Sequence, residues 1–202
     1  MSFFQNTCKP KGIGGKIMVN MMNIGHSSMA KWGFTHIRIK NNSICLDIGC
    51  GGGANVKRLL DKVPYGKVTG IDYSEISVIK SKTSLPKGRS ITLACKISQR
   101  SFFIPVLLVF FDLITAFETI YFWPDILEAF KQVHRVLKPN GTFMICNEVN
   151  GENPKDENWT KIIDGMKIYN SEQIRKTLES AGFIDIKIDM NGKNWLCVIC
   201  KK

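Results

Sequence analysis

The chain has 202 residues, of which 44% are hydrophobic and 22% are charged, with 17 glycines and only 7 prolines. This composition excludes an intrinsically disordered chain and is sufficient for one well-packed domain. The longest apolar run, Phe102 to Phe111, is interrupted by Pro105 and is far shorter than the roughly 20 apolar residues that a membrane-spanning helix needs. We therefore expect no such helix and no membrane partner.

The charge of the chain is unevenly distributed. Its net charge is +11, and residues 1–110 hold 16 basic and 4 acidic residues, whereas residues 111–202 hold 12 and 13. A basic half is compatible with binding to nucleic acid or to anionic lipid. The lysines are dispersed, however, with no dense cluster and no interleaved aromatic residues, which favours a solvated lysine-rich surface.

The seven cysteines are an odd number and lie in apolar stretches such as Ile44-Cys45-Leu46. We expect them to be reduced core residues of a cytoplasmic protein, and the N-terminal residues show no pattern of a secretory signal. Cys197 and Cys200 have the spacing of half a metal-binding knuckle, but residues three apart on a strand face opposite sides and no second pair lies nearby. The sequence therefore predicts no metal site.

Strands and helices alternate along the predicted chain. Residues 1–40 are expected to form an N-terminal helical cap, with one or two short helices over residues 16–32. Strands are then predicted over residues 43–48, 67–71, 91–95, 111–117, 142–147, 183–188 and 195–200. Helices are predicted over residues 55–62, 74–84, 123–137 and 170–182, with a polar loop over residues 150–158. Residues 41–202 thus predict one α/β domain with a mostly parallel sheet and one antiparallel strand at the end.

The segment Ile44–Ala54 is the most informative, because an apolar strand runs into nearly continuous glycine before a helix begins. Missing Cβ atoms let a ligand lie against the backbone, and the start of the helix offers free N–H groups. The end of this loop lacks the Gly-Lys-Ser/Thr sequence of a phosphate-binding P-loop. Gly49, Gly51 and Ala54 do satisfy the G-x-G-x-x-G/A pattern of dinucleotide-binding folds, so the glycines alone leave the ligand open.

Two acidic residues narrow the choice of ligand. Asp47 lies two residues before the first glycine, where a carboxylate suits an ammonium group and would repel a pyrophosphate. Asp72 ends the second predicted strand, where a carboxylate accepts hydrogen bonds from ribose hydroxyls. One acid for an amine and one for a ribose describes S-adenosylmethionine better than a nicotinamide dinucleotide, which disfavours an oxidoreductase.

At this point the chain resembles a known family. Leu46–Gly53 looks like motif I of the class I S-adenosylmethionine-dependent methyltransferases, and the chain most resembles their small, stand-alone type-11-like group. Four further stretches resemble the family's acidic loop, fourth strand, "RVLKPGG" turn and "aGF" start of the sixth strand, in the family's order: Gly70–Ser74, Phe111–Phe117, Arg135–Thr142 and Ala181–Phe183. The resemblance covers about residues 40–202.

The resemblance implies a Rossmann-like, seven-stranded, mostly parallel sheet with strand order 3-2-1-4-5-7-6, an antiparallel last strand and helices on both faces. It also implies S-adenosyl-L-methionine as cofactor, with Asp47, Gly49 and Gly51 around the methionine moiety and Asp72 on the ribose. Neighbouring positions are expected to complete the cofactor-binding set, namely Cys50, Tyr73, Ala116 and Phe117.

Candidates for the chemistry lie in the loop after the fourth predicted strand, at the sheet edge where ligands bind in α/β folds. A protonated methyl acceptor needs a base within hydrogen-bond reach, and Glu118 is the best candidate. Tyr121 is predicted to wall the substrate pocket and His26 to act from the N-terminal cap. Asn147 and Glu148 end the fifth strand at the same edge and are candidates for contact with the substrate. Purely structural roles are the alternative for each of these residues.

Residues 96–110 depart from the family's pattern, because they contain no acid and no turn residue besides Pro105. The family has an acid beside the adenine in this region. Two explanations are open: a disturbance of the reading frame, and an additional buried strand or lid. If the disturbance removes the adenine pocket, the chain is a degenerate member of the family that no longer binds the cofactor.

These observations together predict an enzyme, an S-adenosylmethionine-dependent methyltransferase acting on a small-molecule acceptor. A small acceptor is preferred because the chain leaves room for only a small cap and contains no separate nucleic-acid-binding module. A methyltransferase that acts on RNA through the basic half is the enzyme alternative. The sequence identifies neither the acceptor nor the oligomeric state.

Overall fold

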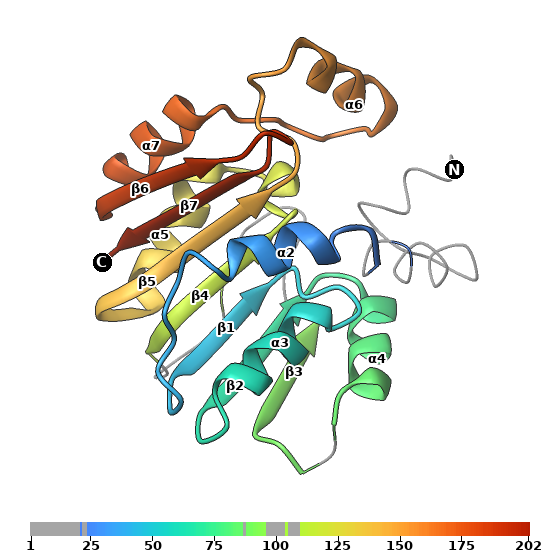
Figure 1. Cartoon of the computed structure of the whole chain (residues 1–202), viewed down its shortest axis with the longest axis vertical. Helices are drawn as coiled ribbons and strands as arrows, with labels where there is room; N and C mark the ends of the chain where they lie inside the picture. The colour runs from blue at the N-terminus through green and yellow to red at the C-terminus, as the bar shows by residue number, and fades with distance from the viewer. Residues whose placement is uncertain (1–20, 22–23, 87, 96–103, 105–109) are drawn as a thin grey trace.

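A computed structural model describes residues 21, 24–86, 88–95, 104 and 110–202 of the chain (Figure 1). Its seven strands form one sheet in the order β3-β2-β1-β4-β5-β7-β6. In chain order the strands are β1 (Ile44–Ile48), β2 (Lys67–Asp72), β3 (Ile91–Cys95), β4 (Phe111–Phe117), β5 (Leu137–Asn147), β6 (Ile184–Met190) and β7 (Leu196–Lys201). The neighbours from β3 to β5 are parallel, and β7 runs antiparallel to both β5 and β6. This arrangement confirms the predicted strand order and directions.

Helices cover both faces of the sheet (Figure 1). They are α2 (Ser27–Gly33), α3 (Ala54–Lys62), α4 (Glu75–Ser84), α5 (Ile126–Val136), α6 (Glu157–Ile162) and α7 (Ser171–Ser180), with short 3₁₀ turns at Ile120–Phe122 and Pro154–Asp156. Capping residues in the sequence determine where several of these helices begin. The Ser74 hydroxyl accepts the Ser77 N–H, and Asn170 forms a reciprocal capping box with Gln173.

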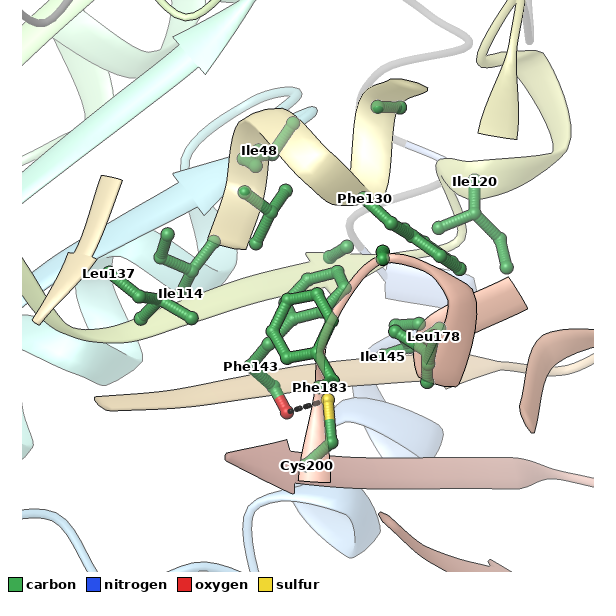
Figure 2. Packing of buried hydrophobic residues seen from close by; sticks show 14 of the residues in the cluster. Ile48, Ile114, Ile120, Phe130, Leu137, Phe143, Ile145, Leu178, Phe183 and Cys200 are labelled. Carbon is green, nitrogen blue, oxygen red and sulfur yellow. Dashed lines mark hydrogen bonds between the residues drawn. The ribbon is translucent and has the colours of Figure 1, made fainter. Parts of the chain in front are cut away.

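The larger core lies between the sheet and helices α5 and α7. Phe143 of β5 packs against Phe130 of α5 and against Phe183, and the ring centroids are 5.7 Å apart in each pair. Figure 2 shows these three residues in the core. Burial of each such side chain stabilises the fold by about 1.5–3 kcal/mol. Cys200 belongs to this core, whereas Cys197 belongs to the core on the other face, as strand alternation predicts.

The second core lies between the sheet and helices α2 and α3. Met29 and Ala30 of α2 are fully buried in it together with Leu59 of α3. Helix α2 approaches β5 closely, because a Cβ at Gly33 would lie 2.7 Å from the Cys146 Sγ. This close packing holds the last residue of α2 against the sheet, and His26 lies at the other end of the same short helix.

Two elements differ from the prediction. Strand β5 begins at Leu137 and not at residue 142, because the pairing register with β4 shifts between Phe111 and Leu113 and lets residues 138–141 bulge. Helix α6, which was not predicted, begins at the end of the predicted polar loop and continues beyond it to Ile162. It has six residues and buries none of them, so no apolar periodicity in the sequence could reveal it.

Several expectations fall on residues outside the described part of the chain. These include residues 1–20 and 22–23 of the expected cap and nearly all of the unusual 96–110 segment. Among the helices of the described residues, none is long and apolar enough to cross a lipid bilayer.

Candidate functional site

The glycine loop connects β1 to α3, and three of its glycines adopt backbone conformations that favour glycine. The φ angles of Gly49, Gly51 and Gly53 are +74°, +50° and +85°. A Cβ at Gly49 would lie 2.7 Å from the Thr119 Cβ, and a Cβ at Gly53 would lie 2.9 Å from the Ser81 Oγ. A Cβ at Gly51 would meet no atom within 4 Å. The loop is therefore closed by protein at its two ends and open at Gly51, where a ligand can lie against the backbone.

Asp72, at the end of β2, is connected directly to the open part of this loop. Its Oδ2 accepts the Gly51 N–H at 2.9 Å and its Oδ1 accepts the Ser74 N–H at 2.8 Å. Burial raises the pKa of Asp72, although the hydrogen bonds from Ser74 and Gly51 oppose the shift. The Tyr73 N–H and the Ser77 hydroxyl also donate to this carboxylate, so a ribose hydroxyl that binds Asp72 would take the place of one of these donors.

Asp47 lies deeper, near the end of β1, with 2% of its surface exposed. The Thr115 hydroxyl donates to its Oδ1 at 2.7 Å. Burial raises the pKa of Asp47 to about 7, and the hydrogen bond from Thr115 only partly opposes this. Asp47 therefore changes charge near neutral pH, and a nearby cationic ligand group would favour its ionised form.

The other residues predicted to bind the cofactor lie around the loop. Tyr73 is half-buried beside Asp72. Ala116 and Phe117 are buried on opposite faces of the sheet. Cys50 is buried, with its Sγ 4.0 Å from the Ser81 hydroxyl. The side chains of Cys50, Ala116 and Phe117 thus contribute to the interior that supports the loop, and their contact with a cofactor stays a prediction.

A second group of polar residues gathers at the carboxyl ends of β4 and β5. The Nδ1 of His26 lies 3.1 Å from the Glu148 Oε2 and 3.9 Å from the Glu118 Oε2. His26 directly precedes α2, Glu118 follows β4 and Glu148 follows β5. We call these three residues the His–Glu–Glu cluster. The structure thus brings together the predicted residues His26 and Glu118 with Glu148, which the sequence indicated only as a substrate contact.

Glu118 is the most constrained member of the cluster. Its Oε1 accepts the backbone N–H of Glu148, and the Tyr121 hydroxyl donates to the same oxygen at 3.2 Å. Its φ angle is +56°, in the left-handed region that few residues other than glycine adopt. Strained backbone conformations of this kind concentrate at functional sites, where they aim a side chain.

Burial and the contacts between charged groups set the pKa values of Glu118 and His26. Burial raises the pKa of Glu118 to about 7, although His26 and the Glu148 N–H oppose the shift. Burial lowers the pKa of His26, but the contacts with Glu148 and Glu118 outweigh it and leave this pKa above its usual value. Shifts of this kind are typical of functional sites.

Tyr121 anchors the cluster to the segment after β5. Its buried hydroxyl accepts the Val149 N–H at 3.1 Å, and the Val149 carbonyl, 2.9 Å away, shares the single hydroxyl hydrogen with Glu118. This position supports a positioning role in addition to the predicted wall of a pocket. Asn147 is fully buried, and its side-chain amide has no hydrogen-bond partner among the described residues. It therefore lies beneath the site surface, and its predicted substrate contact stays untested.

Arg58, which connects α2 to α3, was not among the residues predicted from the sequence. Arg58 of α3 donates to the Ser27 hydroxyl at 2.6 Å and to the Asn55 Oδ1 at 2.9 Å. Ser27 directly follows His26, so this contact holds the cluster histidine near the start of α3. An arginine–serine pair this far apart in the chain has no spacing or motif that could reveal it.

Comparisons with known proteins support a family assignment. A family model described as "Methyltransferase domain" matches residues 46–145. Arginine-hydroxylase NDUFAF5 of Mus musculus is 32% identical over 102 residues, which are 50% of this chain and 27% of that protein. Demethylmenaquinone methyltransferase of Lactobacillus johnsonii is 26% identical over 140 residues, which are 68% of this chain and 57% of that protein. The chain thus spans a quarter to just over half of the length of these relatives.

The fold agrees with this assignment. The solved structure of a SAM-dependent methyltransferase from Aquifex aeolicus matches with a TM-score of 0.72 and 18% identity, covering 92% of this chain and 97% of that one. Together with the strand order and the glycine loop, these similarities place the chain in its family. The chain belongs to the class I S-adenosylmethionine-dependent methyltransferases.

Proposed function

We propose that the chain binds S-adenosylmethionine and transfers its methyl group to a small-molecule acceptor. When bound, this cofactor supplies an electrophilic methyl group on a sulfonium. The residues present fit it: the opening at Gly51 leaves room against the backbone, Asp72 would hold the ribose, and Asp47 would face the ammonium group.

One contact carries this proposal. Gly49 of the glycine loop packs against Thr119, the residue that follows Glu118. The cofactor loop and the His–Glu–Glu cluster are therefore neighbours at the carboxyl edge of the sheet, where α/β folds bind their ligands. An acceptor placed there would have His26, Glu118 and Glu148 within reach as groups that bind it and accept its proton.

Charge supports a small acceptor over RNA. The cluster combines two carboxyl groups with one imidazole, a set that would repel phosphates. Basic side chains instead line a surface pocket at the amino ends of β1, β4 and β5, among them Arg38, Lys40, Lys138 and Lys201. Because this pocket lies at the opposite edge of the sheet, its charge would not guide an RNA to the cluster.

We also propose a domain organisation for the chain and a location in the cell. We infer that residues 1–40 form a cap over the domain of residues 41–202, and the placement of His26 at the cluster supports this role. A cytoplasmic location is supported by the five cysteines whose side chains the structure describes, which are all buried and unpaired.

The test is a calorimetric titration of the purified chain with S-adenosylmethionine. The informative variant is Gly51→Ala, because its methyl group would enter the open space at the loop. Gly165→Ala is the matched control, since Gly165 also has a positive φ and open space but lies outside the loop. We expect saturable binding that Gly51→Ala weakens at least tenfold and Gly165→Ala leaves unchanged. A folded chain that binds no cofactor would instead establish the degenerate alternative.

A further inference from the structure

The geometry of the His–Glu–Glu cluster matches that of a set of metal ligands. One imidazole nitrogen and two carboxylate oxygens, each from a different element of the fold, lie within 4.8 Å of one another. Metal bonds of about 2.0–2.2 Å place neighbouring ligand atoms roughly 3–3.5 Å apart. The separations of 3.1 and 3.9 Å from the His26 Nδ1 to the two glutamates are close to this range.

One carboxylate oxygen of Glu118, Oε1, accepts hydrogen bonds from neighbouring groups, as the outer oxygen of a metal-binding carboxylate usually does. The Glu148 N–H and the Tyr121 hydroxyl both bind its Oε1, so that Oε2 is directed toward His26. Outer hydrogen bonds of this kind orient a ligand and are a regular feature of metal centres. The left-handed backbone at Glu118 gives an independent sign that the fold constrains this side chain.

The histidine supplies another indication. The Nδ1 of His26 is shielded from solvent and faces the Glu148 Oε2 at 3.1 Å, although its side chain is 33% exposed as a whole. Two carboxyl groups beside one imidazole also give this half-buried cluster more acidic than basic groups, and a cation would neutralise their negative charge.

We propose that His26, Glu118 and Glu148 bind a divalent transition-metal ion. A site with one imidazole and two carboxylates suits Mn²⁺, Fe²⁺ or Zn²⁺, whereas Mg²⁺ and Ca²⁺ prefer sites made only of oxygen ligands. Three protein ligands leave coordination positions open for a further molecule. If the proposed function holds, that molecule is the acceptor, and the cation favours one that presents an oxygen donor such as a hydroxyl group.

The experiment measures metal binding to the untagged, metal-stripped chain without cofactor or acceptor. Mn²⁺ and Zn²⁺ are titrated separately, by electron paramagnetic resonance of free Mn²⁺ and by calorimetry. We expect one bound ion per chain and at least a tenfold weaker affinity in Glu148→Gln, whose side chain is the most accessible of the two glutamates at 29% exposed. His26→Gln is a second variant with the same expected loss, and thermal melts establish that both variants are folded.

Asp189→Asn is the matched control, because Asp189 forms a histidine–carboxylate pair with His36 at 3.3 Å outside the cluster. Its metal affinity is expected to equal that of the unchanged chain. The proposal is overturned if the unchanged chain binds neither ion at millimolar concentration, or if folded Glu148→Gln binds as tightly as Asp189→Asn. Because the titration contains no S-adenosylmethionine, its failure is distinct from a failure of cofactor binding.

Discussion

Gly49 and Thr119 are packed so closely that no side chain fits between them, and this contact joins the two halves of the site. Gly49 belongs to the loop after β1, and Thr119 follows Glu118 in the loop after β4. The Thr119 Oγ1 also accepts the indole N–H of Trp123 at 3.3 Å, and Trp123 is buried in the core. The position of the cluster loop is thus set jointly by the glycine loop and by the core.

The first prediction follows from this contact. In Gly49→Ala the new methyl group would collide with Thr119 at a backbone φ of +74°, so Thr119 and its loop must move. We expect a loss of about 2–4 kcal/mol in the free energy of unfolding, measured by urea denaturation. Gly165→Ala has a similar φ of +78° but open space, and is expected to lose only about 1 kcal/mol. Equal losses in the two variants would show that steric contact with Thr119 is unimportant.

Most of the fold follows from the sequence because its determinants are local. Apolar runs that end in glycine or in an acid mark β1 and β2, and Ser74 marks the start of α4. Helix α6 could not be predicted in this way, because it buries no residue and so has no apolar face. The bulge before the main part of β5 depends on pairing with β4, which no local pattern encodes.

The candidate site also has one part that the sequence predicts and one part that depends on tertiary packing. The family's sequence motifs predict that the glycine loop and Asp72 lie together, and in the structure the Gly51 N–H donates to the Asp72 carboxylate. The His–Glu–Glu cluster, in contrast, depends on the packing of α2 against β5 at Gly33 and on the contact between Arg58 and Ser27. The sequence can nominate His26 and Glu118 by residue type, but only the folded chain brings them together.

The second prediction concerns the pH dependence of stability. Asp47 has a pKa of about 7 in the folded chain against an ordinary value of 3.8, so the folded state holds a proton that the unfolded state releases. Stability due to Asp47 therefore falls as pH rises from about 4 to about 7 and is level above that. One pKa unit corresponds to about 1.4 kcal/mol, so the effect is on the order of a few kcal/mol.

Asp47→Asn removes this penalty while keeping an oxygen for the Thr115 hydroxyl. We expect the variant to be more stable than the unchanged chain at pH 8, with a difference that shrinks toward pH 4, measured by urea denaturation across this range. Asp61→Asn, at an exposed acid of α3, is the control and is expected to show no such trend. A constant difference between Asp47→Asn and the unchanged chain at all pH values would contradict the prediction.

The third prediction links Asp47 to the cofactor. At pH 6 Asp47 is mostly protonated in the free chain, and an ammonium group beside it favours the carboxylate. Binding of S-adenosylmethionine should therefore release up to one proton. Calorimetric titrations at pH 6 in buffers of different ionisation enthalpy measure this number, and Asp47→Asn should release markedly less. If the observed binding heat is the same in all buffers, Asp47 does not face the ammonium group.

The fourth prediction concerns Tyr121 as a positioning residue. Tyr121→Phe removes the hydroxyl that contacts Glu118 and both backbone groups of Val149. Because these buried groups lose their partner, we expect a loss of about 1–3 kcal/mol in the free energy of unfolding. Glu118 also loses one of the two donors that orient it, so Mn²⁺ affinity should fall several-fold while S-adenosylmethionine affinity changes little. Tyr169→Phe, at a half-buried tyrosine elsewhere, is the control for loss of a hydroxyl. Unchanged Mn²⁺ affinity in a Tyr121→Phe chain that has lost stability would reduce Tyr121 to a purely structural residue, because the hydroxyl would then stabilise the loop without orienting the carboxylate.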